Sequence, residues 1–160
     1  MLNTVHNKHP LLIIEDSDED FEITCWALAK ANLHCPIERS SKAEEVLLSL
    51  SARASQVDCE PPLPKLILLD LNLPSMGGRQ FLEKLKLIEH IPIIPVVVLS
   101  TSNNPRDIEK AYRLGAQGYI CKPLSLEVYV KKMQALVNYW FDAVEVPNNH
   151  QMFSPNTQSR

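Results

Sequence analysis

Short apolar runs alternate along the chain with longer segments in which apolar residues recur every three or four positions. The short runs are typical of buried strands and cover residues 11–14, 35–39, 66–70, 94–99 and 118–121. The periodic segments predict helices over residues 17–29, 41–50, 78–89, 104–114 and 126–141. This alternation favours an α/β fold of the flavodoxin-like (βα)5 type: a doubly wound five-stranded parallel sheet, order 2-1-3-4-5, with helices on both faces.

Helix-capping signals refine these boundaries. Ser41 and Glu44 form a capping-box pattern at the start of the second helix. Asn104, followed by a proline at the first helical position, predicts the start of the fourth helix, and Gly115 predicts its end.

The segments without periodicity define the expected limits of the domain. Residues 51–65 contain three prolines and predict a loop longer than most connections in compact domains. We expect one domain over residues 10–145, flexible termini at 1–9 and 146–160, and no separate output domain.

Asp70 ends a run of four aliphatic residues and is followed by Pro74 and the pair Gly77-Gly78. A buried parallel strand with this ending delivers the carboxylate to the carboxyl end of the sheet, where open α/β folds bind ligands. The proline and glycines then force a loop, so Asp70 is expected at the rim of the sheet. Such a carboxylate can act as a nucleophile, bind a metal or cap the following helix, and this stretch leaves the three roles open.

Four other polar residues follow predicted strands and should share that rim, because parallel strands end at one edge of a sheet. They are Glu15, Asp16, Ser100 and Lys122. Two carboxylates ~4 Å apart repel by about 4 kcal/mol at an effective dielectric near 20, so the rim needs a cation. Oxygen ligands without histidine or cysteine favour Mg²⁺, which usually also binds a phosphate oxygen. Asp70 could then attack a phosphoryl group whose oxygens Lys122 and Ser100 hold.

Composition narrows the classes of function. The net charge is −3 and basic residues do not cluster, so we expect no nucleic-acid partner. The four cysteines lack a Cys-x-x-Cys spacing, which favours reduced thiols over a zinc site. No segment approaches the roughly 18 apolar residues of a membrane span, so we expect no membrane partner and a cytoplasmic protein.

In the order and spacing of its rim residues, the chain from about Leu11 to Trp140 resembles the receiver domains of two-component response regulators. This resemblance implies that Asp70 is the phosphoacceptor. It also implies a Mg²⁺ site formed by Glu15, Asp16, Asp70 and the backbone carbonyl of Asn72. Glu15 stands where aspartate is commoner in the family, which lengthens the reach of the carboxylate.

The same resemblance assigns the remaining site residues. Lys122 and the proline after it match the lysine that accompanies the phosphoacceptor, Ser100 matches the switch hydroxyl, and Tyr119 matches the switch aromatic. Spacing alone gives Tyr119 no such role, because an aromatic residue in a short strand is usually a packing residue. The resemblance implies that phosphorylation changes the surface formed by the fourth helix, last strand and last helix.

The function implied is that of a single-domain response regulator, phosphorylated by a sensor histidine kinase in a Mg²⁺-dependent reaction. The 51–65 loop and the closing helix are similar to those of regulators that serve cyanobacterial phytochromes, so a phytochrome is a candidate kinase. Such a protein catalyses only its own phosphotransfer and dephosphorylation. One alternative is a receiver-like scaffold that works without phosphorylation. A metal-dependent phosphatase is less favoured, because it needs an acid where this chain has Asn72.

Four aromatic residues on the last helix suggest a partner surface. They are Tyr129, Tyr139, Trp140 and Phe141. One inward stripe of a helix does not easily bury all four, so some should be exposed in a monomer. We therefore expect a homodimer formed through the last helix, against the alternative that Trp140 and Phe141 fold back onto the domain.

Overall fold

The computed structural model describes residues 8–56 and 59–147. Its parallel strands form one sheet in the order β2-β1-β3-β4-β5, which confirms the predicted topology. The strands are β1 (Leu11–Ile14), β2 (Ile37–Ser40), β3 (Leu66–Asp70), β4 (Val96–Ser100) and β5 (Gly118–Cys121). The helices are α1 (Asp18–Lys30), α2 (Ala43–Ala54), α3 (Gly78–Leu85), α4 (Pro105–Arg113) and α5 (Leu126–Val137), and α5 continues into a π-helix, η1 (Asn138–Ala143).

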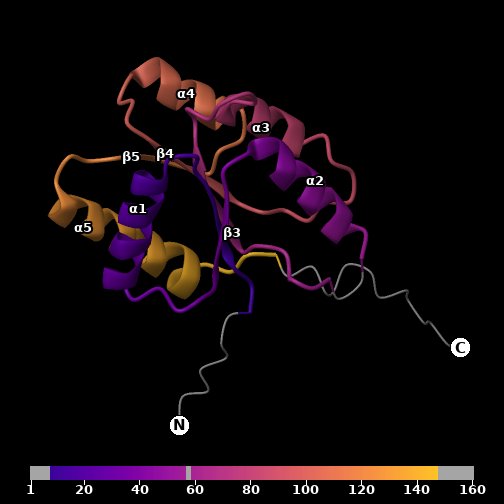
Figure 1. The fold of residues 1–160 in the computed structure, drawn as a ribbon, viewed down its shortest axis with the longest axis horizontal. Coiled ribbons are helices and arrows are strands. Elements are labelled where there is room, and N and C mark those ends of the chain that lie inside the picture. The colour runs from indigo at the N-terminus through magenta and orange to yellow at the C-terminus, as the bar shows by residue number, and fades with distance from the viewer. Residues whose placement is uncertain (1–7, 57–58, 148–160) are drawn as a thin grey trace, which may run out of the picture.

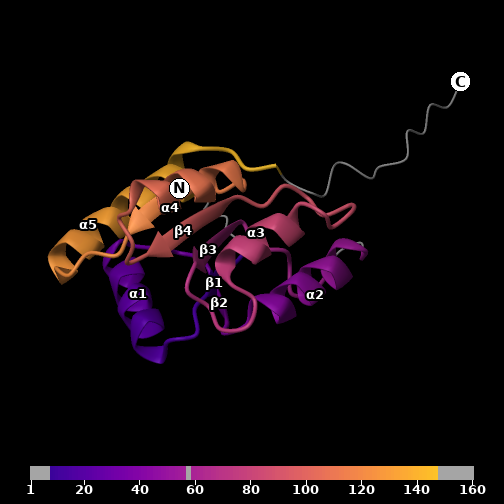
Figure 2. The same ribbon diagram turned by 90° about the horizontal axis from the view of Figure 1, so that it is seen from above.

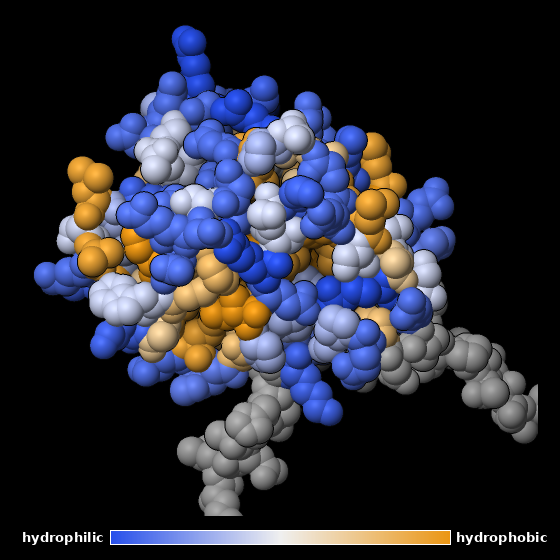
Figure 3. Space-filling view, in the orientation of Figure 1, coloured by the Kyte–Doolittle hydropathy of each residue, from blue (hydrophilic) through white to orange (hydrophobic). Residues whose placement is uncertain are grey.

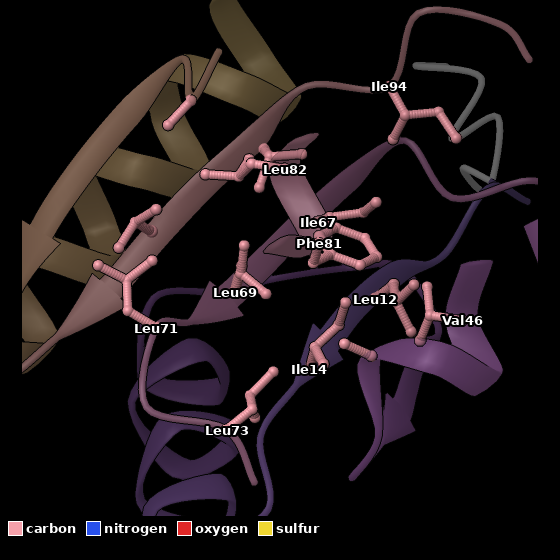
Figure 4. Close-up of a cluster of buried hydrophobic side chains, with 14 of the residues drawn as sticks. Leu12, Ile14, Val46, Ile67, Leu69, Leu71, Leu73, Phe81, Leu82 and Ile94 are labelled. Atoms are coloured by element: carbon pink, nitrogen blue, oxygen red, sulfur yellow. The ribbon is translucent and has the colours of Figure 1, made fainter. Parts of the chain in front are cut away.

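Helices cover both faces of the sheet, with α1 and α5 on one side and α2, α3 and α4 on the other (Figures 1 and 2). The central strands bury every residue because alternate side chains enter the two layers. In β3, Ile67 and Leu69 point toward Phe81 of α3, as Figure 4 shows, and Leu66 and Leu68 pack against α1 and α5. Two hydrophobic cores therefore hold β3, which carries Asp70.

The predicted capping box at the start of α2 is wrong. Lys42 occupies the N-cap position and makes no side-chain capping bond. Glu44 instead accepts a hydrogen bond from the backbone N–H of Met76 at 2.8 Å, in the loop that follows β3. The carboxylate has a tertiary partner that competes with the local cap, and it ties α2 to the loop after Asp70.

Other boundaries move by a few residues for identifiable reasons. β4 begins at Val96, because Pro95 before it has no N–H to donate to the ladder. α3 ends at Leu85, and the next residues form tighter turns in which Leu87 N–H bonds to Lys84 O. At α4 the predictions are confirmed: Asn104 caps the first turn, and Gly115 follows the helix with φ of 102°.

The 51–65 segment is more ordered than a slack loop. Its first residues belong to α2, which continues to Ala54. Arg53 forms an ion pair with Glu38 of β2 at 3.2 Å and donates hydrogen bonds to the carbonyls of Pro61 and Pro62. Leu63 is buried beyond these prolines. The described part of this segment is therefore held against the edge of the sheet.

The two ends of the chain lie mostly outside the described residues, so the expected flexibility of 1–9 and 146–160 stays a prediction. At the start of the described chain, Nδ1 of His9 lies 2.8 Å from the carbonyl oxygen of Leu63. Within the described residues, none of the helices has the length and apolar character needed to cross a bilayer.

The aromatic residues of the last helix have different environments. Tyr129 is buried, and its hydroxyl lies 2.8 Å from that of Thr24 in α1. Trp140 and Phe141 are half-buried against the α1/α5 core, whereas Tyr139 is 54% exposed. Tyr139 meets the expectation that some of these aromatics are exposed, and Tyr129 belongs to the core. Trp140 and Phe141 pack back onto the domain, as the alternative to the dimer expected.

Candidate functional site

Lys122 lies among three carboxylates at the carboxyl edge of the sheet. Its Nζ is 2.7 Å from Glu15 Oε2, 2.8 Å from Asp20 Oδ2 and 3.3 Å from Asp70 Oδ2. Glu15 and Asp70 are buried, and the Lys122 side chain is 11% exposed. The ammonium group therefore offsets the repulsion among the acids at the place where the sequence requires a cation.

Strand ends bring these groups together. Asp70 is the last residue of β3, while Glu15 and Lys122 follow β1 and β5 directly. The backbone N–H of Lys122 continues the ladder by donating to Ser100 O at 2.7 Å, so β4 fixes where the lysine side chain begins. Of the five residues predicted at this rim, Glu15, Asp70 and Lys122 converge through their side chains, and Ser100 lies beside Lys122 through its backbone. The fifth, Asp16, is exposed.

Asp20 is a site residue that the sequence analysis missed. It lies in the first turn of α1, where acidic residues are also favoured by the helix dipole, so its presence carried no special signal. Ser17 caps the helix and accepts a hydrogen bond from the Asp20 N–H at 3.2 Å. Side chains in a helix lean toward its N-terminus, which directs this carboxylate back to the sheet edge. The N-cap at Ser17, combined with the direction in which helical side chains lean, could have identified Asp20 as a rim residue.

The environment raises the pKa values of both Glu15 and Lys122. The rise favours the neutral form of the acid and the charged form of the lysine. Burial raises the pKa of Glu15, and hydrogen bonds from Lys122 and the Ser17 N–H offset part of the rise. Burial by itself lowers the pKa of Lys122, but hydrogen bonds to Asp20 and Glu15 and the charge of Asp70 more than reverse this effect, so the pKa lies above the ordinary lysine value. Lys122 is therefore a permanent cation at neutral pH.

Asp70 is held in one orientation by both of its carboxylate oxygens. Oδ1 accepts a hydrogen bond from the Asn72 N–H at 2.9 Å, and Oδ2 faces Lys122. The Asn72 side chain is exposed, so its amide takes no part in the buried cluster. Asp16 is also exposed, and its carbonyl accepts from Arg39 Nη2 at 3.4 Å. The metal roles expected of Asp16 and of the Asn72 carbonyl stay predictions.

Ser100 and Tyr119 meet through a third residue. Ser100 is 1% exposed, and its Oγ accepts a hydrogen bond from the Ser102 N–H at 3.2 Å. Tyr119 is half-buried, and its hydroxyl donates to the carbonyl of Ser102 at 2.9 Å. The expected switch pair is thus linked through the backbone of Ser102.

The donor set at the rim fits a hard divalent cation. Oxygen atoms of Glu15, Asp20 and Asp70 lie within 4.8 Å of one another, and no other group of three possible ligands in the described residues comes as close together. Carboxylates are the ligands that Mg²⁺ and Mn²⁺ prefer. A cation bound there would share the charge balance with Lys122.

Comparison with known proteins places the chain in a family. The family model of the response regulator receiver domain matches residues 11–134, so the chain belongs to the response regulator receiver family. It is a signalling domain, and its fold is the one expected from the sequence.

Similar proteins include regulators associated with phytochromes. The chain is 32% identical over 139 residues to response regulator Rcp1 of Synechocystis sp., covering 86% of this chain and 92% of Rcp1. The crystal structure of the phosphorylated cyanobacterial phytochrome response regulator RcpA has a TM-score of 0.75 and 31% identity, covering 88% of this chain and 99% of that one. The Mn²⁺-bound form of Rcp1 has a TM-score of 0.73 and 30% identity, with the same coverage.

Proposed function

We propose that this protein is a response regulator that accepts a phosphoryl group on Asp70 from a sensor histidine kinase, in a reaction that needs Mg²⁺. The observation that carries the proposal is the pairing of Asp70 with Lys122 inside a cluster of three carboxylates. A bound divalent ion would supply charge neutralisation at the phosphoryl oxygens. Similar regulators whose structures contain a phosphorylated chain or Mn²⁺ support the same assignment.

The residues around Asp70 suit in-line attack by one carboxylate oxygen on the phosphorus of a phosphohistidine, with the P–N bond breaking and the kinase imidazole leaving. The Asn72 N–H holds Oδ1, so the carboxylate cannot rotate freely, and Oδ2 faces the Lys122 ammonium. Lys122 can transfer its contact to a phosphoryl oxygen because it already lies beside the attacking atom. Ser100 can donate its hydroxyl proton to another oxygen. Asp16, Asp70 and the Asn72 carbonyl would hold the cation together with Glu15, and Asp20 is an added candidate ligand.

The readout in this proposal is a change at the surface of α4, β5 and α5. Phosphorylation draws the Ser100 hydroxyl toward the phosphoryl group, and Tyr119 responds through its position beside Ser102. The Tyr119–Ser102 hydrogen bond is present without phosphorylation, so the proposed switch would change a contact that the unmodified chain already makes.

A phytochrome is the candidate kinase. The support is the similarity to Rcp1 and RcpA over nearly their whole length. Light-regulated and other sensor histidine kinases, offered in parallel as phosphorylated donors, would identify the preferred partner by the rate of transfer.

Transfer from such a kinase should occur in millimolar Mg²⁺ and stop when EDTA is added. Asp16→Asn should weaken Mg²⁺ binding about tenfold, the lower end of the effect of disturbing a metal site. Calorimetric titration with Mg²⁺ gives this affinity, and circular dichroism checks that the fold is intact. The control is Glu19→Gln, which removes another exposed charge from the same acidic stretch. Undiminished transfer in EDTA, or equal affinities for both variants, would reject the metal assignment.

We also propose a homodimer formed through the surface around α5. Leu124, Leu126 and Val128 are exposed at the start of this helix, and Leu124 is fully exposed. Figure 3 shows hydrophobic side chains reaching the surface at the end of the molecule where α5 begins. Tyr139 adds exposed aromatic area at the other end of the helix. Burying such side chains against a second copy removes apolar area from water.

Leu124→Lys should convert the dimer to a monomer without changing the fold, since the side chain has no contacts to lose within the domain. Leu48→Lys on α2, where the leucine is 73% exposed, is the matched control and should leave the dimer intact. Sedimentation velocity at micromolar concentration, with and without phosphorylation, measures both. A wild-type monomer in both states would exclude the dimer.

A further inference from the structure

A second polar cluster lies between the first turns of α3 and α4. The carboxylate of Asp107 accepts hydrogen bonds through both oxygens, one from Arg79 Nη2 and the other from the Ser102 hydroxyl at 2.7 Å. Ser102 also donates its N–H to Ser100 Oγ and accepts from the Tyr119 hydroxyl. One residue thus contacts both members of the proposed switch pair, and Asp107 holds that residue in place.

The other end of this cluster is attached to the phosphoacceptor strand. Arg79 follows Gly78, whose backbone lies so close to Asp70 that a Cβ added to Gly78 would be 2.5 Å from the Asp70 carbonyl oxygen. The Gly78 N–H also donates to Leu71 O at 3.2 Å. The first turn of α3 therefore cannot shift without the end of β3, and a shift at Asp70 reaches Arg79 directly.

The hydrogen bond between Ser102 and Ser100 determines what the Ser100 hydroxyl can do. A serine hydroxyl has one proton to donate and lone pairs that accept. Because Ser100 Oγ already accepts from the Ser102 N–H, its own proton is free to be donated to a phosphoryl oxygen on Asp70. The position of Ser102 thus prepares Ser100 for that contact.

Two observations separate the Arg79–Asp107 pair from an ordinary surface ion pair. Its side chains are 41% and 31% exposed, and Arg79 Nε is buried without a hydrogen-bond partner in the described part of the chain. A buried unpaired donor is unfavourable. The position of the Arg79 side chain is therefore set by its packing and its contact with Asp107, and not by satisfying all of its own hydrogen bonds. By contrast, the Arg113–Glu109 pair on the outer face of α4 is 76% and 62% exposed.

We propose that Arg79 and Asp107 are positioning residues for the phosphorylation switch. They hold Ser102 so that Ser100 can engage the phosphoryl group, and they transmit that engagement to α4 and Tyr119. This inference rests on the proposed phosphorylation of Asp70. It adds a second connection from Asp70 to α4, through α3, beside the direct one through Ser100.

Asp107→Asn keeps the shape of the side chain but removes its charge and one of its two acceptor oxygens. The variant should still be phosphorylated by a phosphorylated kinase in Mg²⁺. The change in hydrogen–deuterium exchange that phosphorylation causes in residues 102–121 should fall about fivefold, the lower end of usual allosteric couplings. Ser102→Ala removes the hydroxyl that Asp107 holds and that accepts from the Asn104 N–H, so it should give at least the same loss. Arg79→Met combined with Asp107→Asn should be no worse than either alone, because both act on one path.

Glu109→Gln on the same helix is the control and should keep the full exchange difference. Ser100→Ala tests the proposed switch itself and should also remove the difference. If wild-type protein is not phosphorylated, the proposed function fails, and this inference fails with it. If wild-type protein is phosphorylated and shows the exchange change, but Asp107→Asn and Ser102→Ala show it undiminished, the positioning role alone is overturned.

Discussion

Asp70→Asn should reduce phosphorylation of this protein to background. The amide nitrogen of asparagine is not a nucleophile, and its remaining oxygen is neutral, so an acyl phosphate cannot form. The fold should survive, because the substitution keeps the side-chain shape and relieves repulsion with Glu15. The measurement is incorporation of labelled phosphate from a phosphorylated histidine kinase in Mg²⁺, with thermal unfolding as a check on folding.

Asp20→Asn is the matched control for this experiment. It removes the same charge from the same cluster and also frees one contact of Lys122. Labelling of this variant should be slower but should reach the wild-type stoichiometry, because the acceptor oxygen remains. Labelling of Asp70→Asn at the wild-type level, or its loss only in Asp20→Asn, would show that another carboxylate is the acceptor.

Gly78→Ala should destabilise the protein by about 3 kcal/mol, the upper end of the usual cost of overpacking. The added Cβ would lie 2.5 Å from the Asp70 carbonyl oxygen and 2.8 Å from the Leu71 Cα, and both are backbone atoms that cannot rotate away. For a domain of this size, the unfolding midpoint should fall by about 10 °C. Phosphate labelling should slow as well, because relief of the clash moves the strand end that carries Asp70.

Gly77→Ala provides the comparison for Gly78→Ala. A Cβ at Gly77 would meet only the Leu71 carbonyl oxygen, at the ordinary distance of 3.7 Å. Gly77 is the N-cap of α3, where replacement by alanine costs less than about 1 kcal/mol. Equal unfolding midpoints for the two variants would contradict the close approach of α3 to β3.

The strand ends of this fold were predictable because they depend on short-range patterns. Uninterrupted aliphatic runs located β1 and β3, and parallel topology then required Glu15, Asp70 and Lys122 to converge. Asp20 was not predictable in the same way, since an acid in the first turn of a helix needs no partner to explain it. Its role depends on the direction of one side chain relative to the sheet.

Tertiary partners also explain the incorrect local predictions. Ser41 and Glu44 have the spacing of a capping box, but the Met76 N–H from another element takes the Glu44 oxygen. The contact of Arg79 with Asp107 joins helices far apart in sequence, and the apolar periodicity of the sequence does not predict it. Such pairings depend on how helices are placed on the sheet, which the apolar pattern determines only approximately.

Lys122 also affects how far the folded state depends on metal ions. Structural zinc sites often leave a chain unfolded when the ion is removed. Here an internal ammonium group neutralises part of the acidic cluster, so the fold should not depend on an ion from solution. The proposed divalent ion would then join a rim that is already assembled. Its removal should change phosphorylation and leave the unfolding midpoint almost unchanged.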